Sequence, residues 1–160
     1  MAYDMEAAVG HLGKVIAVRL KPGTDLLLGL EDVCKQNGIA NGVIISALGS
    51  LNGASFCNPI EMPEKKARYG YGGVTKLSGP IELTGASGII CHDVSGQINL
   101  HVHITLSDRE GTAYGGHLVP ETPVLLTVDA IIGEVCGVNM ERKFDEKLGV
   151  PLFSPRQAQI

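Results

Sequence analysis

One stretch of the chain, residues 24–37, carries its apolar residues at the spacing of an amphipathic helix. Thr24 stands where an N-cap is expected, and Asp25 follows in the first turn, where a negative charge favours the helix dipole. Asn37 and Gly38 form a typical helix end. The apolar positions are Leu26, Leu27, Leu30, Val33 and Cys34. The pattern predicts one main helix whose leucine-rich face packs against the core.

Most of the remaining chain consists of short aliphatic runs separated by glycine and turn residues, which is typical of β-strands. Residues 59–73 are polar and contain Pro and Gly, so we expect a mobile loop there. Residues 139–160 form a charged tail with two prolines, which we expect to pack as an extended arm. The predicted strand regions are 12–20, 39–48, 51–58, 74–91, 97–107, 112–119 and 124–138.

This succession of elements predicts a single domain over residues 1–160, with its core in residues 12–138 and a C-terminal tail. One helix among many short strands indicates an α+β fold. We expect the helix to pack against a mostly antiparallel sheet or an open barrel.

The clearest alternation runs from Gln97 to Leu106 and separates a polar set of side chains from an aliphatic set. Because residues two apart share a face of a strand, His101 and His103 project from the same side as Thr105. Two neutral imidazoles at this spacing are common ligands of zinc and related divalent metals.

A third histidine, His117, follows two glycines in the next strand region. If residues 108–111 form a hairpin turn, register counting brings His117 to within a residue or two of the pair. Three histidines with an open fourth position are typical of catalytic zinc. The spacing leaves open the alternative that the three are solvent-exposed side chains. His92 could face the same region in an uncertain register, and His11 is expected at the surface.

The composition of the 160 residues narrows the classes of function. Hydrophobic residues make up 44% of the chain and aromatic residues only 4%, so the core must be mostly aliphatic. With 13 basic against 17 acidic residues and no basic block, the chain lacks the positive charge on which non-specific binding to nucleic acid depends. No apolar run approaches the ~20 residues of a membrane span. Four cysteines without a metal-type pair predict buried free thiols and a cytoplasmic location.

Two single residues are candidates for chemistry beside a metal. Arg19 ends the first strand and could bind an anion, or simply pair with an acid. Glu82 lies in a β-prone segment and could act as a fourth ligand or as a general acid or base, or be an exposed strand residue. The chain has no GxSxG, P-loop or GxGxxG motif, so those chemistries have no support.

Four segments in this order and spacing resemble the plants and prokaryotes conserved (PPC) domain. They are 19–26 (RLKPGTDL), 45–51 (ISALGSL), 100–108 (LHVHITLSD) and 115–118 (GGHL). The resemblance implies an α+β fold with a main antiparallel sheet, similar to that of acetolactate decarboxylase, and a homotrimer. It also implies that His101, His103 and His117 can hold zinc near a subunit interface. Arg19 and Glu82 match positions where the family usually has Arg and Glu.

Two functions follow as expectations. In the first, the protein binds or transforms a small anionic molecule, as a metal-dependent lyase or decarboxylase, with Glu82 moving a proton and Arg19 orienting the anion. In the second, it is a DNA-binding or regulatory module, although the chain lacks the AT-hooks that plant members of the family carry. A third possibility is a trimer whose histidines bind no metal.

Overall fold

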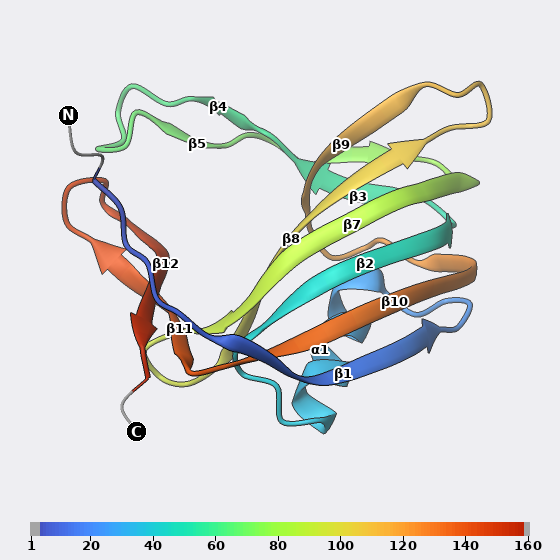
Figure 1. Ribbon diagram of the computed structural model, residues 1–160. Coiled ribbons are helices and arrows are strands. Elements are labelled where there is room, and N and C mark those ends of the chain that lie inside the picture. Colours follow the sequence, from blue (N-terminus) through green and yellow to red (C-terminus); the bar gives the residue numbers. More distant parts are fainter. Residues whose placement is uncertain (1–3, 159–160) are drawn as a thin grey trace.

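A single large, mostly antiparallel sheet organises the part of the chain described by the computed structural model, residues 4–158. Its main path has the order β1-β10-β2-β7-β8-β9-β3-β6, and β11 joins it at the end of β7. The main strands are β1 (His11–Leu20), β2 (Gly42–Leu51), β3 (Ala54–Cys57), β6 (Thr75–Leu77), β7 (Ile81–His92), β8 (Ile98–Ser107), β9 (Ala113–Leu118) and β10 (Val124–Cys136). The sheet stays open (Figure 1), which confirms the predicted α+β class and favours the open sheet over a barrel.

The helix α1 (Leu26–Gln36) begins one residue later than the sequence pattern predicts. Asp25, not Thr24, is the N-cap, and its carboxylate accepts a hydrogen bond from the backbone N–H of Leu28 at 3.0 Å. The same carboxylate accepts from the backbone N–H groups of Glu121 and Thr122 at 2.7 and 2.9 Å. Asp25 therefore holds both the helix start and the loop before β10, which a threonine hydroxyl could not do.

One face of the sheet packs on α1 and forms the core. Leu26 and Leu30 of the helix and Val102 of β8 are fully buried, and Ile104 and Leu106 are at most 2% exposed. The aliphatic set of the alternating strand thus faces the helix, as predicted. Its polar set lies on the opposite face, which we call the outer face of the sheet.

A β-hairpin replaces the mobile loop predicted for residues 59–73. The short strands β4 (Pro59–Glu61) and β5 (Tyr69–Tyr71) pair with each other and project beyond the main sheet (Figure 1). Backbone hydrogen bonds from Lys65 to Met62 and from Arg68 to Lys65 close the turn. The prediction was wrong because strands this short show no period in the sequence.

The tail also folds back on itself as a hairpin of β11 (Val138–Asp145) and β12 (Val150–Gln157), rather than as a single extended arm. The carboxylate of Asp145 accepts from the backbone N–H groups of Lys147 and Leu148, and Gly149 takes a positive φ of 70°. These contacts reverse the chain between the two strands. Lys66 donates to the carbonyl oxygen of Glu146, so the turns of the two hairpins touch.

The cysteines agree with the sequence-based expectation. All four are free thiols, with Cys34, Cys57 and Cys91 buried and Cys136 half-buried. Burial raises the pKa of the Cys34 thiol to about 11, with a smaller contribution from Glu31, which makes this thiol a poor nucleophile. Within residues 4–158, no helix has the length and apolar character needed to cross a membrane.

Candidate metal centre

The hairpin of β8 and β9 brings the three predicted histidines together. His103 of β8 lies directly opposite His117 of β9, and His101 is two residues earlier on the same side of β8. The predicted register is therefore confirmed. Gly116, beside His117, approaches the backbone of β3 so closely that a Cβ atom would lie 2.8 Å from the carbonyl oxygen of Cys57. The two glycines before His117 thus let β9 pack tightly between its neighbours.

The geometry of the three imidazoles fits one metal ion. The Nε2 atoms of His101 and His103 are 3.1 Å apart, and one ring nitrogen from each of the three side chains lies within 4.8 Å of the others. In tetrahedral coordination with zinc–nitrogen distances of 2.0–2.1 Å, two histidine nitrogens are about 3.3 Å apart. Only small side-chain rotations would be needed for His101, His103 and His117 to share an ion.

Burial and neighbouring charges favour the neutral form of two of the three imidazoles, those of His101 and His117. Desolvation lowers the pKa of His117 to about 4, with further lowering by His101, His103 and Arg142. Desolvation also lowers the pKa of His101, followed by the effects of His103 and Arg142. A neutral imidazole offers the lone pair that a metal needs, whereas an imidazolium has none to offer.

Tyr71 of β5 orients one of the three histidines. Its hydroxyl oxygen lies 3.1 Å from Nδ1 of His117, and the two rings stack with their centroids 4.5 Å apart at 26°. If Nδ1–H donates to Tyr71, the His117 tautomer leaves Nε2 free to bind a metal, as is usual for metal-bound histidines. Nothing in the sequence pattern linked Tyr71 to His117, because the contact depends on the unpredicted hairpin.

The histidines line a pocket of about 750 Å³ on the outer face, between the hairpins β4–β5 and β11–β12. Arg142 of β11 also lines it, and its guanidinium donates to Oδ1 of Asn99 and to the carbonyl oxygen of Pro151, both at 3.0 Å. Sequence reasoning missed Arg142 because it lies in the tail, where no period indicated a strand.

The structure does not bring Glu82 to the three histidines within one chain. Glu82 is exposed and pairs with Ser107, four residues past His103 on β8, or about 13 Å along the strand.

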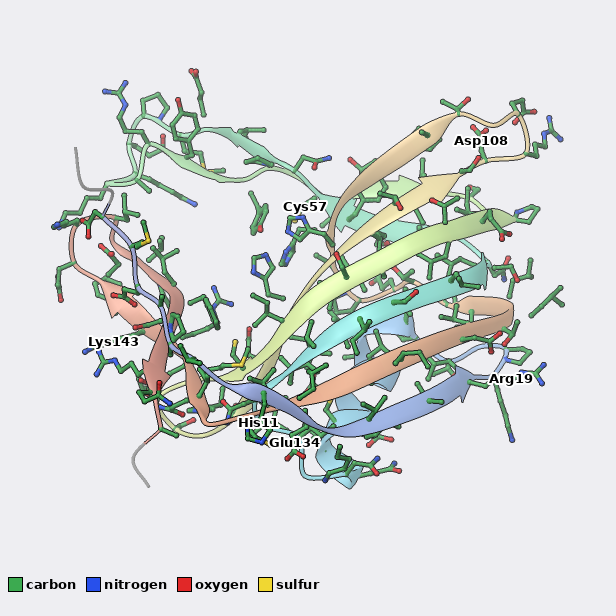
Figure 2. All side chains as sticks on the ribbon, viewed as in Figure 1. His11, Arg19, Cys57, Asp108, Glu134 and Lys143 are labelled. Atoms are coloured by element: carbon green, nitrogen blue, oxygen red, sulfur yellow. The ribbon has the colours of Figure 1, made fainter. Side chains whose placement is uncertain are left out.

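Arg19 also lies away from the histidines within one chain. It lies on β1, about 19 Å away across four strand spacings, and donates to the hydroxyl of Thr127. Figure 2 places Arg19 at the far end of the sheet from Cys57, the residue that pairs with His117.

The two remaining histidines are also separate from the cluster. The ring nitrogens of His92 lie 2.8 Å from Oδ1 of Asn139 and 3.1 Å from the carbonyl oxygen of Asp93. His11 is exposed at the start of β1, opposite Cys136. His92 therefore has a structural role at the end of β7, and His11 lies at the surface as expected.

Residues 4–158 thus form an open, mostly antiparallel sheet with one helix and a cluster of three histidines on two adjacent strands. The sequence pattern of the Plants and Prokaryotes Conserved (PCC) domain, the family abbreviated PPC above, matches residues 7–136. The chain therefore belongs to the PCC domain family.

Solved structures show the same fold. A metal-containing protein from Archaeoglobus fulgidus is 30% identical, with a TM-score of 0.78 over 93% of this chain and 99% of that chain. A plant- and prokaryote-conserved protein from Pyrococcus horikoshii is 28% identical, with a TM-score of 0.77 over 98% and 100%. A chain described as a putative DNA-binding protein, from Bacteroides thetaiotaomicron, is 21% identical, with a TM-score of 0.72 over 91% and 96%.

Among curated proteins, the chain is similar to the bifunctional protein GlmU of a Synechococcus strain, with 28% identity over 136 residues. The match covers 85% of this chain and 20% of that protein. The chain therefore spans about a fifth of the length of this curated relative.

Proposed function

We propose that His101, His103 and His117 hold one divalent metal ion, with zinc the first candidate, and that the protein binds or transforms a small anionic molecule beside it. The strongest support is the convergence of three ring nitrogens within 4.8 Å in a pocket of about 750 Å³. The solved relative from Archaeoglobus fulgidus, which is described as metal-containing, adds support at the level of the family.

A bound divalent ion would polarise a carbonyl or carboxylate oxygen of the ligand, or lower the pKa of a water molecule. Three histidine ligands leave a coordination position for such an oxygen. The reaction class we propose is that of a lyase or decarboxylase acting on a small oxo- or hydroxy-acid. Glu82 and Arg19 can take part in it only if a second copy of the chain contributes them, given their distance from the cluster in one chain.

A homotrimer is part of the same proposal. Away from the hairpins, the outer face carries exposed apolar side chains, which suit contact with another copy of the chain. These are Val15, Ile45, Leu48 and Ile131, with exposures of 56%, 46%, 54% and 37%. A cytoplasmic location stays a prediction from the cysteine usage.

DNA binding is the alternative function and has less support. The relative described as a putative DNA-binding protein is 21% identical and argues for the fold alone. The net charge of −4 opposes attraction to phosphates. Tight DNA binding that weakens steeply with added salt would favour this alternative.

Metal content of protein purified without an affinity tag tests the proposal. We expect about one zinc or other divalent ion per chain. His101→Ala should lose most of the metal, whereas the matched variant His11→Ala, which changes an exposed histidine of β1, should keep it. Circular dichroism should show both variants folded. If the wild-type protein contains no metal and takes up none on titration, the proposed function is wrong.

A further inference from the structure

The guanidinium of Arg142 lines the pocket and is available to bind an anion. We propose that this guanidinium binds the carboxylate of a small ligand that has an apolar or aromatic body and lies beside the three histidines. This inference rests on the proposed function for the metal. The binding of the carboxylate by Arg142 can nevertheless be measured with and without metal.

The guanidinium is held in a fixed place relative to the histidines. Asn99, which accepts from Nη1, lies two residues before His101 on the same face of β8, and Pro151, which accepts from Nη2, belongs to β12. Only two of the five N–H groups of the guanidinium are used in these bonds. The other N–H groups can donate to a ligand, and pre-positioning reduces the entropy lost on binding.

Among the described residues, no carboxylate forms an ion pair with Arg142. Within residues 4–158, the ion pairs join Lys35 to Glu31, Lys76 to Glu121 and Arg109 to Glu110, and none involves Arg142. The described residues that line the pocket include a second cation, Lys65, and no aspartate or glutamate. A pocket with two cations and no acid, in a chain with more acidic than basic residues, selects for anions.

The side chains that line the pocket indicate the chemistry of the rest of the ligand. Tyr69 and Tyr71 line one side, Phe153 and Pro151 another, and Ile89 belongs to the sheet. Such walls suit a carbon skeleton or an aromatic ring, because apolar contact stabilises it without polar partners. A phosphate ester would bring a more strongly hydrated group to a place where few polar groups replace its water. The combination favours a carboxylate.

Part of the pocket that would select this ligand lies outside the segment common to the family, whereas Lys65, Tyr69 and Tyr71 lie inside it. The family pattern matches residues 7–136, whereas Arg142 belongs to β11, and Pro151 and Phe153 to β12. The metal ligands come from the shared core, and the carboxylate receptor comes from the C-terminal hairpin. This hairpin would therefore supply the carboxylate contact and one wall of the pocket.

Calorimetric titration with benzoate tests the inference. Benzoate combines a carboxylate with an aromatic body, benzamide is its neutral counterpart, and phenyl phosphate is the phosphate probe. We expect zinc-loaded wild-type protein to bind benzoate more tightly than either. Arg142→Met should weaken benzoate binding by roughly 10- to 150-fold, since a hydrogen bond to a charged group contributes about 1.5–3 kcal/mol. Lys143→Met is the matched control, because Lys143 points away from the pocket (Figure 2).

The remaining outcomes show whether the carboxylate subsite fails, or the proposed metal function, or both. Three results would overturn the inference. Wild-type protein could fail to bind benzoate, or it could bind benzoate and benzamide with equal affinity. Arg142→Met could also bind benzoate as tightly as wild type. Tighter binding of phenyl phosphate would also overturn it, by assigning the subsite to phosphate esters. The metal content of Arg142→Met should equal that of wild type. If the protein held no metal but metal-free protein bound benzoate through Arg142, the proposed function would fail and the carboxylate subsite would stand.

Discussion

The two ends of the outer face differ in what covers them. At one end, residues of the hairpins β4–β5 and β11–β12 line the pocket together with the histidines of β8 and β9. Both hairpins project from this end of the main sheet (Figure 1). At the other end, β1, β10 and β2 present Val15, Ile45 and Ile131 to solvent. Both ends belong to one continuous sheet with the same alternation of side chains.

The difference shows why the same residue types act differently along one face. Under the hairpins, desolvation lowers the pKa of His117 to about 4 and Arg142 is held by two hydrogen bonds. At the open end, Arg19 is exposed and its charge is screened by water and salt, so its interactions are weak. The covered end is suited to binding a small molecule, and the open end to contact with another surface.

The largest effect is expected from substituting neighbouring isoleucines that point to opposite faces. Ile132 is fully buried in the core, whereas Ile131 is 37% exposed on the outer face. Ile132→Ala should lower the free energy of unfolding by about 2–5 kcal/mol, because it removes buried apolar contacts and leaves a cavity. Ile131→Ala should cost less than about 1 kcal/mol in a single chain. Urea unfolding of the two variants measures the difference, and equal losses would contradict the assignment of the faces.

A charge at the open end should separate the copies of the proposed trimer. Ile45→Asp places a carboxylate among the exposed apolar side chains of β2, where contact with another copy would have to desolvate it. Sedimentation should show a trimer for wild type and a smaller species for Ile45→Asp. Val94→Asp, at a turn position that is 77% exposed, should leave the trimer intact. A wild-type monomer, or a trimer unaffected by Ile45→Asp, would show that this end is not the interface.

Removing the hydroxyl of Tyr71 should have a moderate effect at the covered end. Tyr71→Phe loses the hydrogen bond to Nδ1 of His117 and keeps the stacked ring, so the metal Kd should rise roughly tenfold. Competition with a chelator measures this Kd. Tyr69→Phe is the control, because Tyr69 lines the same pocket from the same strand without a bond to a histidine. An unchanged Kd would mean that stacking alone orients His117.

The same comparison explains what the sequence could predict. His101 and His103 share a face of β8 because side chains alternate with a period of two. His117 lies opposite His103 because a single turn joins β8 to β9. Both features are local in the sequence. Tyr71 and Arg142 reach the pocket through hairpins whose strands are short or carry no period, so no local pattern placed them there. Glu82 and Arg19 lie on strands, as predicted, but the sequence could not show how far along or across the sheet they are from the histidines.

The smallest effect on binding is expected from substituting Glu82 and Arg19. In the single chain of the Ile45→Asp background, Glu82→Gln and Arg19→Met should change neither the metal Kd nor the affinity for benzoate. Glu82 lies about 13 Å and Arg19 about 19 Å from the cluster, beyond the Debye length of about 8 Å at physiological salt. If either substitution weakens benzoate binding in the assembled protein but not in this background, a neighbouring copy supplies the residue to the pocket. A loss in the single chain would instead show that the two ends of the outer face are coupled, contrary to their separation here.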